Sequence, residues 1–234
     1  MAYQSVFKRY EIKFLLSAAQ YELVLAAVEQ HMTPDRYGRT TICNVYYDTE
    51  NYRMIRRSVE KPVYKEKLRL RSYGPVTDGS AVFVELKKKY NAVVYKRRLS
   101  APEDAAKQWL SGGAAPEDSQ IAREIGYVRD HYGDLQPRMY ISYTRRAYFG
   151  KEDPSLRITF DTDIRCRQEQ LTLASQPGGT AVLDPALVLM EVKTPGAIPL
   201  WLTPTLTKHR RYKVSFSKYG TAYEKLLKGE LRHV

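Results

Sequence analysis

Residues 65–71 read Lys-Glu-Lys-Leu-Arg-Leu-Arg, a run in which every second side chain is a cation. In a β-strand successive side chains point to opposite faces, so the cations would project from one face and the leucines from the other. The cations are Lys65, Lys67, Arg69 and Arg71. Like charges on one face of a sheet repel one another. The run therefore predicts a strand whose basic face meets an anionic ligand or a ring of carboxylates.

The same alternation of an apolar and a charged face recurs along the chain. It predicts strands at residues 6–15, 42–47, 64–73, 81–89, 92–99, 138–149, 156–165 and 187–193. The third, fourth and fifth of these runs follow one another across short turns, which indicates an antiparallel meander. No shift in composition marks a domain boundary, although residues 112–117 and 175–180 are typical of loops. The sequence thus predicts one domain over residues 1–234, α+β in class and mainly β.

Helices are predicted between the strands. Ser17 with Gln20 is typical of a capping box that begins a helix, which would continue to about Met32. Ser100 with Glu103 is a second such pair. Further helices are predicted at residues 49–57, 102–110, 116–131 and 217–231.

Most of the predicted strands carry a face rich in cations with isolated carboxylates. The carboxylates are Glu11, Glu85, Asp161, Asp163 and Glu191. If the apolar face points inward, the basic face is an outer surface. If the charged face points inward, the interior is a basic tunnel and helices cover the apolar face from outside. The second arrangement explains why helices are spread along a mostly β chain, and about eight strands suit a narrow interior. We therefore expect a closed eight-stranded antiparallel β-barrel with helices packed outside.

The composition bears on the partner and the compartment. The chain is 43% hydrophobic with a formal net charge of +12, which favours a globular protein with a polyanionic partner. Two cysteines cannot form a disulfide framework or a four-ligand zinc site. Because the chain also shows no signal peptide and no apolar run of membrane length, we expect a cytoplasmic protein without a membrane span.

Short motifs along the chain resemble those of one family in their order. They are residues 9–13 (RYEIK), 45–49 (VYYDT), 68–74 (LRLRSYG), 83–87 (FVELK), 142–145 (SYTR), 157–163 (RITFDTD) and 190–193 (MEVK). Together they resemble the VTC domain, the polyphosphate polymerase branch of the triphosphate tunnel metalloenzymes, which include the CYTH proteins. The resemblance extends from about residue 7 to residue 227.

This resemblance implies a fold, a reaction and a site. Members fold as an eight-stranded antiparallel tunnel with a basic interior, and the branch is similar to enzymes that transfer the γ-phosphate of ATP to a polyphosphate chain with Mn²⁺ or Mg²⁺. The implied partners are ATP and polyphosphate or another polyphosphorylated anion. By motif position, the phosphate-binding and catalytic residues would be Lys13, Arg69, Arg71, Lys87, Lys96, Arg145, Arg157, Lys193 and Lys218. Glu191 matches the carboxylate that holds the metal.

The position of residues on the strands adds candidates to this set. Lys65 and Lys67 lie on the predicted phosphate-binding face and could mark its rim, and Tyr143 falls on the inner side. The remaining carboxylates are either metal ligands or ion-pair partners that orient neighbouring cations. They are Glu11, Glu85, Asp161 and Asp163, the last two being expected partners of Arg157 in the second case.

Two positions depart from the family pattern. Ser215 stands where eukaryotic polymerases have the first of two lysines, so one cation is missing unless Lys208 or Lys213 replaces it. Arg9 stands where CYTH hydrolases have the first of two alternating glutamates. This second departure argues against a simple CYTH-type adenylate cyclase or thiamine triphosphatase.

Three functions remain open from the sequence. They are an ATP-dependent polyphosphate polymerase, a metal-dependent hydrolase of tripolyphosphate or nucleoside triphosphates, and a non-catalytic module that binds polyphosphate, inositol phosphates or RNA. The first two differ only in whether a phosphate chain or water occupies the acceptor position. The P-loop pattern is absent, and no RNP-like strand or zinc finger supports a specific nucleic-acid module.

Overall fold

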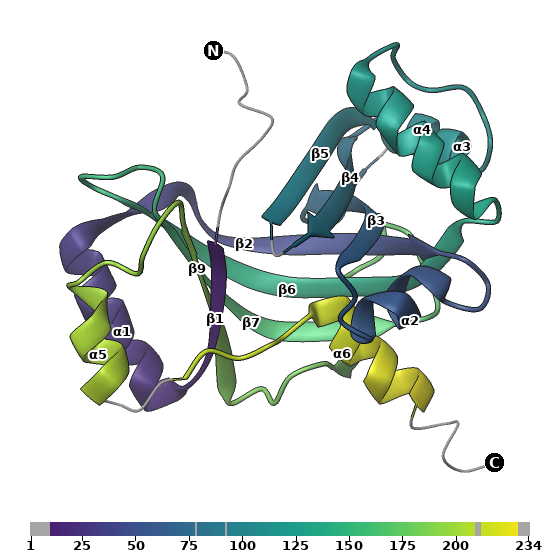
Figure 1. The fold of residues 1–234 in the computed structure, drawn as a ribbon. Coiled ribbons are helices and arrows are strands. Elements are labelled where there is room, and N and C mark those ends of the chain that lie inside the picture. The colour runs from purple at the N-terminus through teal and green to yellow at the C-terminus, as the bar shows by residue number, and fades with distance from the viewer. Residues whose placement is uncertain (1–9, 78, 92, 209–211, 229–234) are drawn as a thin grey trace.

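The computed structural model describes residues 10–77, 79–91, 93–208 and 212–228 (Figure 1). Their strands form one antiparallel sheet in the order β1-β9-β7-β6-β2-β3-β4-β5, with the short β8 paired to β7. The strands are β1 (Tyr10–Ser17), β2 (Met32–Asp48), β3 (Tyr64–Tyr73), β4 (Ala81–Tyr90), β5 (Val93–Pro102), β6 (Gln136–Gly150), β7 (Arg157–Arg167), β8 (Thr180–Ala181) and β9 (Leu187–Thr194). The predicted mainly β class and the β3–β4–β5 meander are confirmed.

Several strand bounds differ from the prediction. β2 begins at Met32 rather than at Ile42, because its first part pairs with the end of β6, where Met32 lies opposite Gly150. Residues 175–180, expected as a loop, end in β8. Residues 6–9 of the predicted first strand lie outside the described ranges.

The helices also match the sequence-based prediction in part. They are α1 (Ala18–His31), α2 (Arg53–Val59), α3 (Glu103–Leu110), α4 (Gln120–Tyr132), α5 (Leu202–Lys208) and α6 (Lys218–Tyr223), which continues as a π-helical turn (Glu224–Lys228). The capping box of α1 is confirmed, since Ser17 N donates to Gln20 Oε1 (2.8 Å) and Gln20 N donates to Ser17 Oγ. α5 was not predicted, and residues 229–231 of the predicted last helix lie outside the described ranges.

The predicted capping box at Ser100 is wrong. Ser100 lies within β5, which stays paired with β4 as far as Pro102, and Pro102 itself precedes α3 without a side-chain cap. The Glu103 side chain instead accepts a hydrogen bond from Leu173 N (3.3 Å). Ser100 therefore belongs to the backbone pairing of β4 with β5 and does not cap α3.

The sheet is strongly curved, and the expected closed barrel is not confirmed. Among the described residues no backbone pairing joins β1 to β5, the two ends of the strand order. Glu11 on β1 nevertheless lies 2.8 Å from Lys87 Nζ on β4, so the first strand of the order contacts the strand next to the last through side chains. The free edge of β1 is accompanied by an extended segment, where Val214 N donates to the Lys13 carbonyl (2.8 Å). The curved sheet therefore encloses a concave side without a continuous ring of strands.

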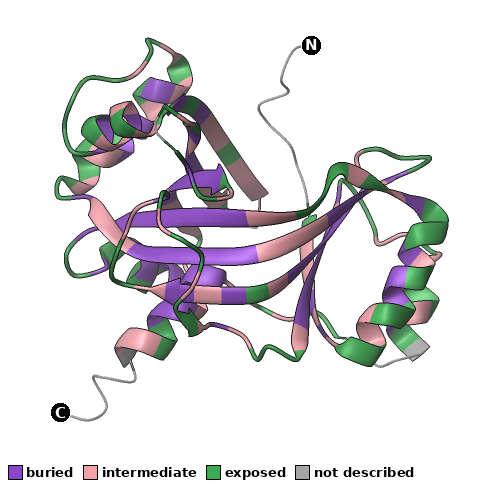
Figure 2. Ribbon diagram, turned by 180° about the vertical axis from the view of Figure 1, so that it is seen from behind, coloured by how far each residue is buried: buried purple, intermediate pink, exposed green. Residues whose placement is uncertain are grey.

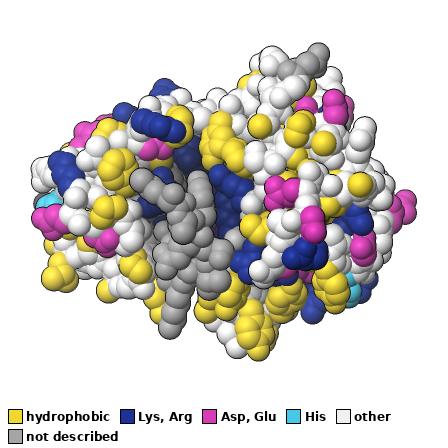
Figure 3. Space-filling model, turned by 90° about the horizontal axis from the view of Figure 1, so that it is seen from above, with side chains coloured by type: hydrophobic (Ala, Val, Ile, Leu, Met, Phe, Trp, Pro, Cys, Tyr) yellow, Lys and Arg dark blue, Asp and Glu magenta, His cyan; other side chains and the backbone are white. Residues whose placement is uncertain are grey.

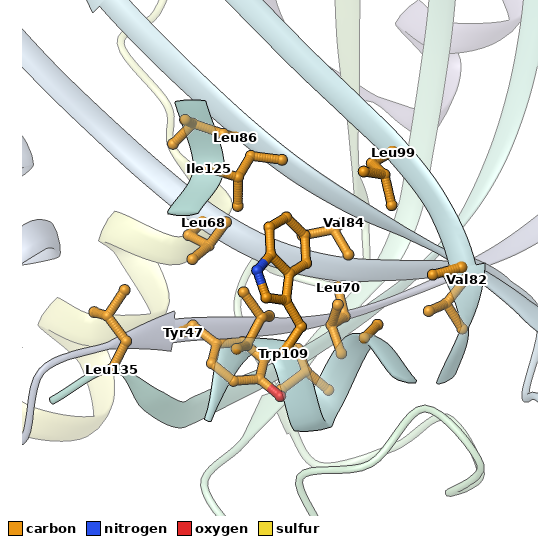
Figure 4. Close-up of a cluster of buried hydrophobic side chains, with 14 of the residues drawn as sticks. Tyr47, Leu68, Leu70, Val82, Val84, Leu86, Leu99, Trp109, Ile125 and Leu135 are labelled. Carbon is orange, nitrogen blue, oxygen red and sulfur yellow. The ribbon is translucent and has the colours of Figure 1, made fainter. Parts of the chain in front are cut away.

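Apolar clusters on the convex side hold the helices against the sheet. One packs α3 and α4 against β3, β4 and β5 around Trp109, whose side chain is 2% exposed (Figure 4). Another packs α1 and α5 against β1, β7 and β9, at the opposite end of the molecule (Figure 1). Burial of this apolar surface stabilises the fold. The arrangement in which helices cover the apolar face from outside is therefore confirmed for α1, α3, α4 and α5.

A third apolar cluster lies at one end of the concave side. There α2 and α6 pack against inward side chains of β2, β6 and β9, such as Ile42, Ile141 and Leu189. The central strands β2, β6 and β7 are consequently buried over much of their length (Figure 2). Cys43 and Cys166 are buried free thiols. None of the helices in the described ranges is long and apolar enough to cross a membrane.

Candidate functional site

The concave face of the sheet carries a dense set of charged side chains. Lys and Arg side chains gather in a hollow of the surface (Figure 3). In the described ranges, the ion-paired or hydrogen-bonded cations of this face are Lys13, Lys67, Arg69, Arg71, Lys87, Lys96, Arg98, Arg145, Lys193 and Lys218. The carboxylates are Glu11, Glu85, Asp161 and Glu191. We call this set the concave site.

Glu85, on β4, is the centre of one half of the site. Its side chain is 1% exposed, and four cations surround it: Arg69 Nη2 at 2.7 Å, Arg71 Nη1 at 3.6 Å, Lys96 Nζ at 2.7 Å and Arg98 Nη2 at 2.5 Å. The strand register explains this, because Arg69 on β3 and Arg98 on β5 lie directly opposite Glu85. We call these five residues the Glu85 cluster.

The Glu85 carboxylate is ionised and fully engaged. Burial acts to raise its pKa, but the four cations together, Arg71 first, outweigh burial and hold the pKa well below its usual range. Both of these arginines are also fixed from β2: Arg69 Nη1 donates to Tyr46 Oη (2.8 Å) and Arg71 Nε donates to Asn44 Oδ1 (3.0 Å). Their forked guanidinium groups are thus oriented before any ligand binds.

Two carboxylates, Asp161 on β7 and Glu191 on β9, form the centre of the other half. Arg145 binds Asp161 with two parallel bonds, from Nε to Oδ1 (2.6 Å) and from Nη2 to Oδ2 (2.7 Å). Lys218, at the start of α6, bridges both carboxylates, with Nζ 2.5 Å from Asp161 and 3.2 Å from Glu191. Lys13 and Lys193 lie 3.5 Å and 3.4 Å from Glu191. We call these six residues the Glu191 cluster.

The charges of the Glu191 cluster stabilise one another. Burial acts to raise the pKa of Glu191, but the four cations of the cluster together, Lys218 first, outweigh burial and hold the pKa well below its usual range. Burial likewise acts to lower the pKa of Lys218, yet Asp161 and Glu191 raise it. The two carboxylates are therefore anionic and Lys218 is cationic at neutral pH.

Tyr143, on β6, lies between the two clusters. Its hydroxyl accepts a hydrogen bond from Arg71 Nη2 (3.1 Å), and its ring centroid lies 4.6 Å from Lys218 Nζ. Burial acts to raise the pKa of Tyr143, but Arg71 and Arg145 outweigh burial and lower it. This tyrosine thus connects the β3 wall to the Glu191 cluster.

Two lysines complete the concave site on the side where β1 approaches β4. Lys87 Nζ binds Glu11 (2.8 Å), and although burial acts to raise the pKa of Glu11, Lys87 and Lys193 lower it to about 2. Lys67, directly opposite Lys87 in the register, donates to Ser217 Oγ (2.6 Å). Lys67 and Lys87 thus lie side by side on the β3–β4 wall, and Glu11 of β1 lies between Lys87 and Lys193 of β9. Such a row of cations is suited to an extended polyanion.

The family model of the VTC domain matches residues 8–227. The chain belongs to the VTC domain family. One curated relative, vacuolar transporter chaperone complex subunit 4 of Trypanosoma brucei brucei, is 25% identical in an alignment 214 residues long that covers 72% of this chain and 27% of the relative. The chain thus spans about a quarter of the length of that relative.

Solved structures share the fold of this VTC domain. A putative adenylate cyclase from Bacillus halodurans aligns with a TM-score of 0.58 at 13% identity, covering 96% of this chain and 100% of the other. A Hippeastrum protein, described as a putative adenylyl cyclase with a dominant triphosphatase activity, aligns with a TM-score of 0.51 at 16% identity, over 90% and 93%. At these identities the likeness concerns the fold alone.

The structure brings together most of the residues that the sequence of this VTC domain singled out. The residues that it gathers are Glu11, Lys13, Lys67, Arg69, Arg71, Glu85, Lys87, Lys96, Tyr143, Arg145, Asp161, Glu191, Lys193 and Lys218. Lys65 instead donates to the Ser58 carbonyl at the end of α2 (3.1 Å). Arg157 lies opposite Lys193 but is exposed, without a hydrogen bond or ion pair to the described residues.

The expected role of Asp163 is wrong. An irregularity in the pairing of β6 with β7 falls beside it, and the residue adopts a φ of +48°, so its exposed side chain pairs with Arg165 (2.6 Å). Arg157 accordingly has neither Asp163 nor Asp161 as a partner among the described contacts. A pure alternation of faces does not predict such a break in register.

Several site residues were missed by the motifs. Arg98 shares a face with Lys96, so strand position alone would have identified it, and the same holds for Asn44 and Tyr46 on β2. Ser217 gave no functional signal, because its contact with Lys67 spans 150 residues of sequence. Such a contact follows only from the tertiary fold.

The two departures from the family pattern have different outcomes. Ser215 is exposed and so is Lys213, and neither makes a hydrogen bond or ion pair with the concave site in the described ranges. Lys218 is therefore the lysine of this segment that reaches the carboxylates. Arg9 and the side chain of Lys208 lie outside the described residues.

The residues of the Glu191 cluster fit a divalent cation whose other ligands come from phosphate. Within the described ranges no group of three or more His, Cys, Asp or Glu side chains is arranged to hold a metal ion. Thr159, however, lies directly opposite Glu191 in the register, and its buried Oγ1 has no hydrogen-bond partner among the described residues. A hard cation such as Mg²⁺ takes oxygen ligands and often keeps waters and phosphate oxygens. Glu191 and the Thr159 hydroxyl could thus supply the protein's share of such a site.

Proposed function

We propose that this VTC domain transfers the γ-phosphate of ATP, or of another nucleoside triphosphate, to a polyphosphate chain bound in the concave site. The observation that carries the proposal is the excess of positive charge on this face. Glu85, Asp161 and Glu191 each contact two or more cations, and Glu11 contacts one. Lys67 lies beside these groups and contacts no carboxylate of the described residues. A ligand with several negative charges in a row would neutralise this excess.

Phosphoryl transfer requires alignment and neutralisation of charge more than covalent help from the protein. Arg69, Arg71 and Arg145 are held by partners on their own or neighbouring strands, so they can fix the register of a phosphate chain without reorganising. Lys87 and Lys193, from facing walls, would neutralise further phosphates of the chain. The attacking group would be the terminal phosphate of the chain, so no protein nucleophile is needed.

Glu191 with the Thr159 hydroxyl would hold a divalent cation, Mn²⁺ or Mg²⁺, in this proposal. When bound, such an ion neutralises charge on the transferring phosphoryl group. Glu85 would serve as a counter-ion, because its oxygens already face four cations. Glu11 would orient Lys87.

A metal-dependent hydrolase is the second candidate. The Hippeastrum protein that shares this fold is described as having a dominant triphosphatase activity. The same alignment of a triphosphate would serve hydrolysis if water, rather than a phosphate chain, occupied the acceptor position. A non-catalytic module that binds polyphosphate or inositol phosphates would use the same cations.

The test is to incubate the purified protein with ATP and Mn²⁺ and to measure long-chain polyphosphate and free phosphate. We expect polyphosphate from the wild-type protein and a loss of roughly 100-fold or more in Glu191→Ala and Arg69→Ala, since both remove charge stabilisation at the reacting phosphates. Arg123→Ala on α4 is the matched control, because it removes an exposed arginine of the convex side. That variant should keep full activity.

Each other outcome points to a different conclusion. Free phosphate without polymer would replace the polymerase by the hydrolase. Tight tripolyphosphate binding without turnover would identify a binding module. Full polymer formation by Glu191→Ala would overturn the metal assignment alone.

A further inference from the structure

Among the described residues, Lys67 differs from the other cations of the concave site in having no carboxylate partner. The cations of the Glu85 cluster share Glu85, those of the Glu191 cluster share Asp161 or Glu191, and Lys87 binds Glu11. In the described part of the chain, Lys67 Nζ has one hydrogen bond, to the neutral Ser217 Oγ (2.6 Å). Ser217 is the N-cap of α6, and its Oγ also accepts from Gly220 N (3.1 Å).

The charged groups that face Lys67 are cations. Lys87 lies directly opposite on β4, and Lys65 and Arg69 follow on the same face of β3. Lys13 on β1 adds to the repulsion from across the hollow. Two carboxylates on neighbouring strands are already engaged. Glu11 binds Lys87, and Asp48 of β2 accepts hydrogen bonds from amides of α2 and from Tyr219 Oη.

This environment disfavours an ammonium group. Burial, followed by repulsion from Lys87 and Lys13, lowers the pKa of Lys67 well below its ordinary value of 10.5. A serine hydroxyl accepts a hydrogen bond but supplies no compensating charge. A ligand phosphate placed between Lys67 and Lys87 would supply the missing negative charge and would raise the pKa of Lys67.

We propose that Lys67 is largely unprotonated while the concave site is empty and gains a proton from solvent when polyphosphate binds, which couples polyanion binding to proton uptake. The inference rests on the proposed function only in taking a polyphosphate as the ligand, and it deepens that function by adding regulation by pH. Binding would weaken as pH rises. Where a single group controls the linkage, the affinity falls by up to about tenfold per pH unit.

The test measures tripolyphosphate binding by titration calorimetry at about pH 8, without divalent metal, in two buffers of different ionisation enthalpy. The difference between the buffers gives the number of protons taken up per ligand bound. Lys67→Arg is the decisive variant, because a guanidinium stays charged at every pH used. Lys67→Met removes the charge altogether. Changes in the protonation of tripolyphosphate itself occur in all three proteins and are removed by comparing them.

We expect the wild-type protein to take up more protons than either variant, by a difference approaching one per ligand. As pH rises from about 7 to 9, the wild-type affinity should fall by a larger factor than that of Lys67→Arg, whose remaining loss reflects Lys96. Lys67→Met should bind more weakly than the wild type at the lower pH. A purely structural role for Lys67 would change affinity by the same factor at every pH. Thermal melting of the free proteins shows whether each variant is folded.

The outcomes separate this inference from the proposed function. Equal proton uptake by the wild type and Lys67→Arg, with tripolyphosphate still bound, would overturn the role of Lys67 and leave the proposed function standing. No binding of tripolyphosphate or long-chain polyphosphate by the folded wild-type protein would overturn both.

Discussion

The Glu85 cluster and the Glu191 cluster are two halves of one site that are assembled from different lengths of chain. All partners of Glu85 lie on the meander β3–β4–β5, within residues 64–102. The Glu191 cluster instead draws on β1, β6, β7, β9 and α6, from Lys13 to Lys218. The first cluster can therefore form from neighbouring strands alone, whereas the second requires the whole fold.

The two clusters also differ in their ratio of carboxylates to cations. Glu85 is one carboxylate among four cations, with 1% of its side chain exposed. Glu191 also lies within 4 Å of four cations, but it shares two of them, Arg145 and Lys218, with a second carboxylate, Asp161. Beside these carboxylates lies the Thr159 hydroxyl, which has no hydrogen-bond partner among the described residues. The comparison indicates that Glu85 orients the arginines as a counter-ion, while the Glu191 cluster offers more oxygen atoms per cation to an added metal ion.

The strongest test of this division is Glu85→Gln, which keeps the side-chain shape and removes the charge. The four cations would then repel one another without a counter-ion. We expect the free energy of unfolding to fall by about 2–3 kcal/mol, less than for a fully buried pair because Lys96 and Arg98 are partly exposed and can turn to solvent. Urea denaturation measures the loss, and tripolyphosphate should restore stability by supplying the missing charge.

Glu124→Gln is the matched control for this variant. Glu124, on α4, also lies between two cations, Arg97 and Lys88, but on the convex side and partly exposed. We expect a loss of less than about 1 kcal/mol and no restoration by tripolyphosphate. If Glu85→Gln kept its stability and lost Mn²⁺ binding instead, Glu85 would be a metal ligand and the division between the clusters would be wrong.

The same contrast explains which parts of the fold and site could be predicted from the sequence. The bounds of β3 were predicted correctly, and the alternation that placed Arg69 and Arg71 on one face follows from backbone geometry alone. The motif around Glu191 indicated a metal ligand only through family resemblance, because no local pattern relates Glu191 to Lys218. The site residues themselves remain predictions until variants are measured.

Three features could not be predicted because they depend on tertiary structure. The pairing of β6 with β7 slips beside Asp163 and turns its side chain outward. Lys65 finds the carbonyl at the end of α2, which a strand pattern does not contain. Among the described residues β1 does not pair with β5, and whether the ends of a sheet meet depends on the twist accumulated over all strands rather than on any one of them.

Thr159→Val sharpens the other half of the comparison. Valine keeps the shape of threonine and removes the hydroxyl, so the fold should tolerate it while one oxygen ligand is lost. We expect the affinity for Mn²⁺ in the presence of tripolyphosphate to fall roughly tenfold, as measured by electron paramagnetic resonance of free Mn²⁺. Thr159→Ser keeps a hydroxyl and should bind Mn²⁺ as the wild type does. Unchanged affinity in Thr159→Val would show that the hydroxyl takes no part in metal binding.

The smallest expected effect concerns Lys96, which belongs to the Glu85 cluster although its environment disfavours its charge. Burial lowers the pKa of Lys96 from 10.5 to about 7, since the attraction of Glu85 is offset by Arg98 and Arg71. Between about pH 7 and 10.5 the unfolded chain therefore binds a proton at this lysine that the folded chain does not bind. The free energy of unfolding must then rise with pH across that window. Below pH 7 both states carry the proton, so this lysine no longer makes the free energy of unfolding depend on pH.

Lys96→Met should remove this contribution, so that the free energy of unfolding rises less steeply from about pH 7 to 9 than in the wild type. Urea denaturation at several pH values, without phosphate ligands, measures the slope. Lys107→Met on α3 is the control, because that lysine pairs with Glu103 on the convex side. An unchanged slope in Lys96→Met would mean that Glu85 keeps Lys96 charged, as Asp161 and Glu191 keep Lys218 charged. The two clusters would then stabilise their lysines in the same way.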